Sequence, residues 1–356
     1  MSVYERDNAG LHISDDTFQD DEGDFDIKKF VINTTNEIWD EQNFDKIYDY
    51  FADDFVSYGA EGREFNDLDQ LFDYVFERTA AFPDTKVFVD DLFWVGDDET
   101  GYRTSHCFTV TGTSKGKSKY GDPTGKRLRL SGIANCKVEK VEGKWKYTEE
   151  RAEDDQFAIA RACTPGPDIA YPVNRLEESL ESVAEKAGSD LQVPSDDEIH
   201  RKNEKIIGGI GSRKGFSPGN FLLDLVKEVW NGKSIGKLEN YYSEDIIFHA
   251  ASGRELRGLE ELRQDVLDRL SAFPSLKMII EDLLVFQVGS NSFKTSLPYT
   301  IIGKNSGHSK YGPPTNRSVK FTGIANRTIK RLNGDWKVTE KWEGFDERRL
   351  MAMDQV

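Results

Sequence analysis

The spacing of apolar residues changes once within the second half of the chain. Apolar residues first recur three to four positions apart in FLLDLVKEVW (221–230), LENYYSEDI (238–246) and LEELRQDVLDRLSAF (259–273). That spacing predicts helices. Apolar and polar residues then alternate in four runs, with Gly and Asn between them: 276–288, 292–303, 317–332 and 335–345. Alternation of this kind predicts antiparallel strands and hairpins. Helices followed by a bent antiparallel sheet predict an α+β domain with the helices packed on one face of the sheet.

The first half of the chain repeats this pattern. Residues 30–155 align with 221–346 at a constant offset of 191 and without a gap, and roughly a third of the positions are identical. The stretch GIAN, for example, stands at 132–135 and again at 323–326. The chain therefore contains two copies of one domain, called copy one and copy two below. The period is far longer than the roughly 20–50 residues of solenoid repeats, so each copy must bury a core of its own.

Composition divides the chain into four segments. We expect an acidic disordered tail at 1–26, a first domain at 27–160, a linker with a helix at 161–217 and a second domain at 218–356. The linker holds Gly- and Pro-rich breakers around a charged helical stretch, NRLEESLESVAEKAG. Nine acidic residues and one arginine precede Ile27, which is typical of a solvated tail.

Charge and cysteine content exclude several classes of protein. The net charge is −17, which argues against nucleic acid or an anionic membrane as the main partner. Three cysteines without CxxC spacing fit neither a disulfide scaffold nor a structural zinc site. The sequence shows no secretory leader and no apolar run of roughly 18 residues. We therefore expect a soluble, cytoplasmic protein without a metal or other cofactor.

The repeated motif SKYG-x-PT, at 118–124 and 309–315, is a candidate phosphate loop. A phosphate loop needs GxxxxGK[ST] after a strand and before a helix. Only three residues separate Gly112 from Gly116 here, and copy two lacks the lysine that would follow. We therefore interpret the motif as a turn between two strands, with Tyr120 and Tyr311 anchoring it.

The same region carries a family resemblance. The segment GTSKGKSKYGDPTGKRLRLSGIANCKVEKVEGKWKYTEERAEDD is similar to the second half of a SnoaL-like polyketide cyclase domain, and WEGFD at 342–346 resembles the end of that family's last strand. The resemblance covers both copies. It implies two tandem cone-shaped α+β domains of the nuclear transport factor 2-like superfamily. One departure is clear, because Ser114 and Asn305 stand where the family has the histidine of its Gly-Thr-His-x-Gly turn.

The resemblance also implies catalytic residues. Asp346 would be the general base that removes a proton from a carbon flanked by carbonyls before an aldol ring closure, and Asp155 is its counterpart. His249 would lie in the pocket, and its counterpart is Tyr58. An ordinary aspartate has a pKa near 3.9 and is a poor base for carbon acids, so burial must raise that pKa. The alternative is that each aspartate only caps the helix that follows it.

A small hydrophobic molecule is the expected ligand. In an enzyme, a cavity reaching Asp346 would be lined by Trp230, His249, Phe293 and Trp342. Other candidate contacts are Trp39, Tyr58, Tyr102, Asn135 and Asn326. Core packing explains the tryptophans as well, and the two asparagines could instead bond across a bulge.

Three functions remain open from the sequence. The first is a cofactor-free cyclase, isomerase or lyase, the second a non-catalytic ligand-binding or scaffold protein, and the third an interaction module that docks a partner. Copy two keeps Trp342 and His249 where copy one has Arg151 and Tyr58, so we expect copy two to hold the better pocket. Fusion of two copies suggests an intrachain pseudo-dimer, with a further homodimer left open.

Overall fold

The computed structural model describes residues 25–118, 121–166, 194–208, 215–310, 312–347 and 350. The expected acidic tail up to residue 24, the expected helix at 174–188, Tyr120 and Tyr311 lie outside these residues. By their contacts the described residues form two units. The first takes in the described part of Met1–Tyr58 with Arg63–Ala152 and Ala162–Pro165, and the second takes in Gly59–Gly62, Glu153–Arg161 and the described part of Gly166–Val356.

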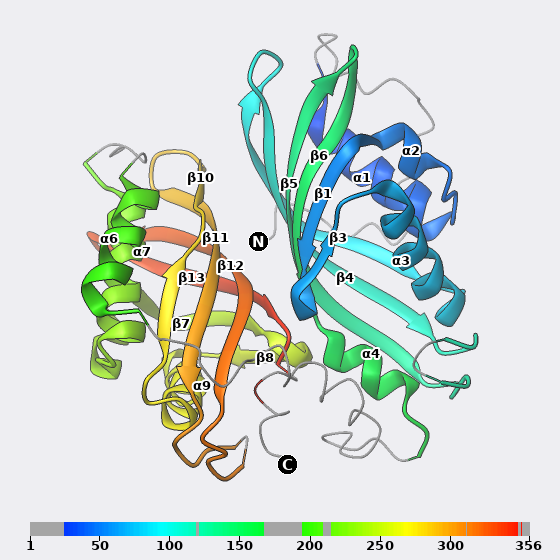
Figure 1. Ribbon diagram of the computed structural model, residues 1–356. Helices are drawn as coiled ribbons and strands as arrows, with labels where there is room; N and C mark the ends of the chain where they lie inside the picture. The colour runs from blue at the N-terminus through cyan, green and yellow to red at the C-terminus, as the bar shows by residue number, and fades with distance from the viewer. Residues whose placement is uncertain are drawn as a thin grey trace. The chain divides into compact units, whose positions relative to one another are not determined.

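Copy one is an open six-stranded sheet covered by helices, in the order β2-β1-β6-β5-β4-β3 (Figure 1). Its elements are α1 (Ile27–Thr35), a π-helical turn (Asn36–Asp40), α2 (Lys46–Tyr50), β1 (Phe51–Gly59), β2 (Arg63–Phe65), α3 (Leu68–Ala81), β3 (Lys86–Asp97), β4 (Gly101–Thr113), β5 (Arg127–Val141), β6 (Lys144–Asp154) and α4 (Gln156–Cys163). Side chains of α1 and α3, such as Phe30 and Val75, pack with Ala134 and Val138 of β5 in one core.

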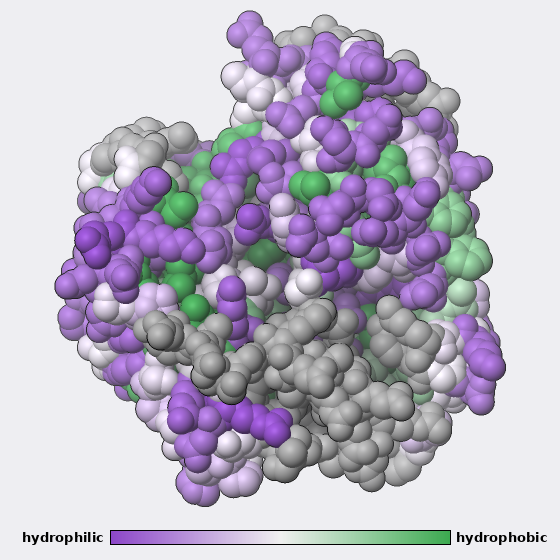
Figure 2. All heavy atoms as spheres, in the orientation of Figure 1, coloured by the Kyte–Doolittle hydropathy of each residue, from purple (hydrophilic) through white to green (hydrophobic). Residues whose placement is uncertain are grey.

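Copy two repeats this architecture with the sheet order β10-β11-β12-β13-β7-β8, and β9 also pairs with β11 (Figure 1). Its elements are α7 (Pro218–Leu225), a π-helical turn (Val226–Asn231), a 3-10 turn (Ile235–Lys237), α8 (Leu238–Tyr241), β7 (Tyr242–Ala250), a second 3-10 turn (Ala251–Gly253), β8 (Arg254–Arg257), α9 (Leu259–Ala272), β9 (Lys277–Ile280), β10 (Leu284–Gln287), β11 (Ser292–Lys304), β12 (Ser318–Leu332) and β13 (Asp335–Phe345). The expected α+β class with helices packed on a curved sheet is confirmed for both copies. Figure 2 shows that most of the surface on one side of the molecule is hydrophilic, as is usual for a folded chain in water.

One further helix, α6 (Asp196–Ile207), lies in the range expected to link the copies. Ser195 and Glu198 form a capping box at its N-terminus, which satisfies two backbone donors reciprocally. The helix is tied to the sheet of copy two, because the Ile280 backbone N–H donates to the Asn203 side chain at 2.8 Å.

Two details of the predicted elements are wrong. The helix expected over 238–246 ends at Tyr241, and a strand begins at Tyr242. The strand expected over 276–288 is broken into β9 and β10, which both pair with β11. Pro298 lies on β11 between the two pairings and has no N–H to donate, so the ladder is interrupted there. Copy one has Cys107 at this position, and its β3 runs on as one strand, although its register shifts between Val89 and Asp91.

The repeated turn performs the structural role expected of it. The Ser114 N–H donates to the Lys126 carbonyl at 2.9 Å, and the Thr124 N–H donates to the Ser114 hydroxyl at 3.2 Å. In copy two Asn305 takes the place of Ser114, and its side chain accepts from the Thr315 N–H at 2.7 Å. The side chains of Ser114 and Asn305 therefore hold this turn in shape.

An extra residue in β13 changes which side chains face the helices. Val338 pairs with Ile329, but Glu340 pairs with Thr328, so Thr339 is a bulge. A bulge reverses the alternation of faces beyond it. Val338 and Phe345 both lie in the core although they are seven residues apart, which strict alternation cannot give. The face that packs on the helices is called the inner face below, and the opposite one the outer face.

Substitution of Gly323 should disturb this inner face. A Cβ at Gly323 would overlap the ring of Tyr299 on the neighbouring strand. We expect Gly323→Ala to lower the free energy of unfolding by about 1–3 kcal/mol, as overpacked cores do. Gly236→Ala is the matched control, because nothing lies within 4 Å of its added Cβ. Urea unfolding of both variants measures the difference, and equal stabilities would contradict the close packing described here.

Candidate functional site

The structure divides the candidate binding residues between the two faces of each sheet. Four lie in the cores, and therefore on the inner face: Trp39, Tyr102, Trp230 and Phe293. Five alternate with core residues and therefore lie on the outer face: Tyr58, Asn135, His249, Asn326 and Trp342. The expectation that Trp230, Phe293, His249 and Trp342 line one cavity is therefore wrong. Trp342 lies on the outer face because the bulge at Thr339 reverses the alternation of the strand before this residue.

The outer face of copy two holds a compact ionisable group around His249. Its imidazole stacks on Trp342 with ring centroids 3.7 Å apart. Its Nε2 lies 3.3 Å from Glu340, and its Nδ1 lies 3.8 Å from Glu255. The imidazole lowers the pKa of Glu340, chiefly through this hydrogen bond. In copy one the counterpart is a guanidinium–ring contact, with Arg151 5.2 Å from the centre of the Tyr58 ring.

The two asparagines of the repeated GIAN lie at paired positions of their sheets. Asn326 pairs in register with Ser296 on one side and Trp342 on the other, and the bulge lies beyond it at Thr339. Asn135 pairs with Ser105 within a regular stretch of β4 and β5. Their repeated positions are therefore regular outer-face positions of the sheet.

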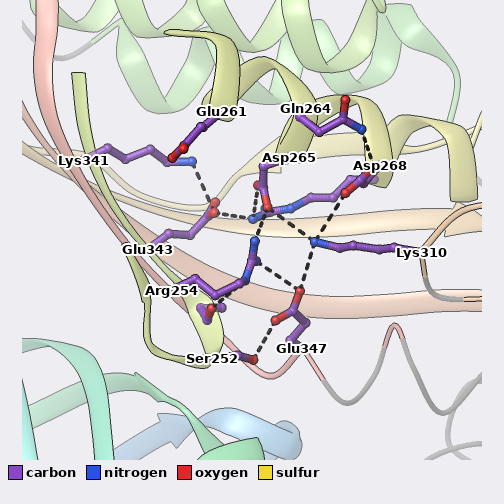
Figure 3. Close-up of polar contacts among 12 residues, drawn as sticks. Ser252, Arg254, Glu261, Gln264, Asp265, Asp268, Lys310, Lys341, Glu343 and Glu347 are labelled. Carbon is purple, nitrogen blue, oxygen red and sulfur yellow. Dashed lines mark hydrogen bonds and ion pairs between the residues drawn. The ribbon is translucent and has the colours of Figure 1, made fainter. Parts of the chain in front are cut away.

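The inner face of copy two contains a buried ionic network that the sequence did not reveal (Figure 3). Arg269 of α9 donates to Asp265, one turn earlier, and to Glu343 of β13, both at 2.8 Å. The Tyr299 hydroxyl donates to the other Glu343 oxygen at 2.9 Å. Arg254 of β8 bonds to Asp265 at 2.8 Å. In Figure 3 the side chains of Arg254, Asp265 and Glu343, which come from β8, α9 and β13, point toward one another.

The charges of this network decide the ionisation of its carboxyl groups. Burial opposes ionisation of Glu343, but Arg269 and Lys341 more than offset it, and the pKa of Glu343 is held well below its usual range. Burial also opposes ionisation of Asp265, and Arg269 and Arg254 lower its pKa in the same way. Both carboxylates are therefore charged at neutral pH and neutralised by cations of the same copy.

Lys341 closes the network from β13. Its side chain is fully buried, and its Nζ lies 3.2 Å from Glu343 and 4.1 Å from the centre of the Phe248 ring. Burial lowers the pKa of Lys341 to about 8, although Glu343 opposes the shift. A strict alternation from Val338 would have placed Lys341 on the outer face, so only the bulge brings it inside.

Copy one has a more open inner face. Trp230 is 2% exposed and Tyr299 is 1% exposed, whereas their counterparts Trp39 and Phe108 are half-buried. Glu150, the counterpart of Lys341, is also half-buried. These exposures do not support our expectation that copy two holds the better pocket.

The inner face of copy one differs from that of copy two in having smaller side chains and a histidine. Copy one has Ser57 where copy two has Phe248, and Ala152 where copy two has Glu343. His106 of β4, which pairs with Ala134, is buried on the same face. Burial lowers the pKa of His106 to about 4, so the imidazole is neutral at pH 7, and its Nδ1 has no hydrogen-bond partner among the described residues.

The two candidate bases lie just beyond the last strands, and both are buried. Asp155 caps α4, because its Oδ1 accepts from the Ala158 N–H at 3.0 Å. Its Oδ2 is buried and makes no hydrogen bond among the described residues. Burial raises the pKa of Asp155 to about 7, the Ala158 N–H opposes the shift, and the Glu347 and Asp346 carboxylates add to it. The capping role is thus confirmed for Asp155, while residues 348 and 349 after Asp346 lie outside the described chain.

Two other kinds of site are absent from the part of the chain that the structure describes. Across the described residues, no three His, Cys, Asp or Glu side chains gather where they could hold a metal ion. The helices that the structure describes are all too short or too polar to cross a membrane.

Removing Arg269 from the network should lower the stability of the protein more than removing Lys341. We expect Arg269→Met to lower the free energy of unfolding by about 3–5 kcal/mol, because it leaves Asp265 and Glu343 buried with less compensating charge. Lys341→Met should cost about 1 kcal/mol or less, since Glu343 keeps Arg269 and Tyr299. Denaturant unfolding at pH 7 compares the two, and equal losses would contradict the central place of Arg269.

Comparison with known proteins agrees with the fold and with the duplication. The model of the family described as SnoaL-like polyketide cyclase matches residues 29–163 and again 221–353. No curated protein matches the sequence. Among solved structures, one from Jannaschia sp. CCS1, provisionally described as a SnoaL-like polyketide cyclase, is 17% identical, covers 39% of this chain and 94% of its own, and has a TM-score of 0.33.

Two other structures show a similar degree of likeness. AclR from Streptomyces galilaeus, provisionally described as a hydroxylase, is 21% identical over 46% of this chain and 97% of its own, with a TM-score of 0.33. IdmH from Streptomyces antibioticus, provisionally described as a polyketide cyclase, is 16% identical over 37% and 94%, with a TM-score of 0.31. With the family model matching each half in turn, the chain belongs to the SnoaL-like polyketide cyclase family and carries two copies of its domain in tandem.

Proposed function

We propose that this protein binds a small, mainly apolar carbonyl compound and removes a proton from it without a cofactor. Membership of the SnoaL-like polyketide cyclase family supports this class of chemistry.

The base in this proposal is Asp155. The sequence favoured Asp346, but the state of the Asp155 carboxylate supports Asp155. This group is buried, one of its oxygens caps a helix, and the other makes no hydrogen bond among the described residues. Its pKa is about 7. A general base is most effective when its pKa lies near the working pH. Burial supplies that condition for Asp155.

Loss of the Asp155 carboxylate should abolish proton abstraction. An aryl 1,3-diketone in D₂O serves as the probe, and NMR measures protein-catalysed exchange of the proton between its carbonyls. We expect exchange by the wild type to rise with pH and to be half-maximal near pH 7, because only the ionised form of Asp155 accepts a proton. Asp155→Asn should reduce the rate at least about 100-fold, in the range of general-base contributions.

Asp346→Asn is the matched control for this experiment. Asn caps helices about as well as Asp, so neither variant should lose a cap. If Asp346→Asn abolishes exchange and Asp155→Asn does not, the base is Asp346, as the family resemblance implies. If neither the wild type nor the variants accelerate exchange of the probe, proton abstraction from this class of compound is excluded.

The raised pKa of Asp155 should also appear in the pH dependence of stability. The folded protein binds the Asp155 proton more tightly than the unfolded chain, so stability falls as pH rises from about 4 through 7. A rise of about three pKa units corresponds to a cost on the order of 4 kcal/mol at pH 8. We expect Asp155→Asn to be more stable than the wild type at pH 8 and nearly equal to it at pH 4.5. Urea unfolding at both values measures this, and a difference that does not change with pH would contradict it.

A non-catalytic ligand-binding or scaffold protein is the second candidate function. The dense ionic filling of copy two favours it, since a filled interior stabilises a domain without leaving room for a ligand. We also keep the intrachain pseudo-dimer and a cytoplasmic location as proposals, which rest on the duplication and on the composition of the chain.

A further inference from the structure

Four aromatic side chains gather on the helices of copy one. Phe44 and Tyr48 lie just before and within α2, and Phe72 and Phe76 lie one turn apart on α3. The ring centroid of Phe44 is 5.9 Å from that of Phe72 and 5.7 Å from that of Phe76. The rings of Phe72 and Phe76 are stacked at 6.2 Å, and Tyr48 lies 6.3 Å from Phe72. These four residues are called the aromatic patch below.

Much of the aromatic patch is open to solvent. Phe76 is 50% exposed and Tyr48 is 43% exposed, while Phe44 and Phe72 are half-buried. Phe44 and Phe72 also pack against the core of copy one, so the patch is anchored in the fold. Single exposed apolar residues are normal on a protein surface, but a contiguous group of them marks a binding surface.

Copy two does not have this patch. At the offset of 191, the four rings correspond to Ile235, Glu239, Arg263 and Leu267. Two of these residues are charged, and Arg263 forms an ion pair with Glu260 at 3.6 Å. The shared fold therefore does not need aromatic rings at these positions, and the patch is a feature of copy one alone.

Carboxylates flank the aromatic patch. The Tyr48 hydroxyl donates to Asp69 at 2.8 Å. This hydrogen bond is the largest cause of the raised pKa of Tyr48, and the charges of Asp45 and Asp73 add to it. All three aspartates are exposed. The surface thus has the anatomy of a protein interface, with an apolar centre and a charged rim.

The charge of the two segments that carry the patch indicates the kind of partner. Residues 44–50 and 67–81 contain six acidic and two basic residues, so their formal charge is −4. Both basic residues have partners within the protein. Lys46 lies 3.4 Å from Asp49, and Arg78 donates to the Tyr74 hydroxyl at 2.7 Å. Such a surface attracts a cationic partner, and it repels an anionic membrane or a second copy of itself.

We propose that the aromatic patch docks a basic amphipathic segment of a partner protein. Large apolar side chains of that segment cover the four rings, and its lysines or arginines face Asp45, Asp69 and Asp73. Aromatic anchors supply most of the affinity at such interfaces, and charges at the rim supply specificity. The inference goes beyond the proposed function, because it assigns a partner to α2 and α3 and not to the last strands, where the candidate bases lie.

Fluorescence anisotropy of a labelled peptide tests the proposal on the full chain. The probe is a peptide of leucine and lysine whose leucines recur three to four positions apart, so that they share one face of a helix. The control peptide has the same composition in an order that spreads the leucines around the helix. We expect the amphipathic peptide to bind at least about tenfold more tightly than the control peptide. Its binding should weaken as salt is raised, because the rim charges are exposed.

Variants of the rings test which surface the peptide occupies. Phe76→Ser removes an exposed anchor, and Phe72→Arg introduces the residue type that copy two has at this position. Each should weaken binding of the amphipathic peptide at least about tenfold. Thermal unfolding confirms that the variants are folded, and Phe76→Ser serves if Phe72→Arg does not fold.

Two further kinds of variant complete the test. Asp45→Asn and Asp73→Asn should each weaken binding about two- to fivefold, as expected for exposed charge pairs. Phe88→Ser is the matched control. Phe88 is 54% exposed, and its neighbour Val89 packs on the core, so Phe88 lies on the outer face of the sheet. Its replacement should leave the affinity unaltered.

Several outcomes would overturn the proposal. One is equal affinity of the wild type for the two peptides, and another is wild-type affinity for the amphipathic peptide in both phenylalanine variants. Sedimentation of the full chain without peptide tests a different occupant. If the wild type self-associates and Phe76→Ser is a monomer, the patch is a face between two copies of this chain, and the assignment to a basic partner is wrong.

Discussion

One extra residue in the last strand determines what lies inside the second domain. Without the bulge at Thr339, the residues beyond it would alternate in phase with Val338, and Glu340 and Trp342 would face the helices. With it, Lys341 and Glu343 turn inward, and Glu343 pairs with both Lys341 and Arg269. Copy one shows the same change of phase, since Tyr147 and Ala152 both pack on its core although they are five residues apart.

The two copies have used this shared inner face in different ways. Copy two fills this face with charged side chains that neutralise one another. Burying them costs desolvation energy, and their ion pairs fix the geometry of the interior. Copy one has smaller side chains on this face, Ser57 and Ala152, and its two arginines contact the Tyr74 ring. Duplication allows such divergence, because one copy can maintain the fold while the other changes its chemistry.

At Asp155 a helix cap and burial act on the same carboxylate. The cap of α4 engages one oxygen of Asp155, and burial acts on the whole group. A carboxylate held in this way has a fixed orientation and a pKa near neutrality, which are both conditions for a base at a carbon acid. The two readings of Asp155 from the sequence, cap and base, are therefore compatible.

The sequence by itself determined the duplication, the fold class and the ranges of most helices and strands. Periodicity and a constant offset report on neighbouring residues, and the tight turns between the last two strands were readable from their Asn-Gly and Glu-Gly pairs, whose residues adopt positive φ. Only the tertiary structure decided which face each strand residue occupies. A bulge leaves no clear mark in the alternation of residue types, so His249 and Trp342 could not be separated from Trp230 and Phe293. The ionic network and the rise in the pKa of Asp155 likewise depend on burial by segments distant in sequence, which no local pattern records.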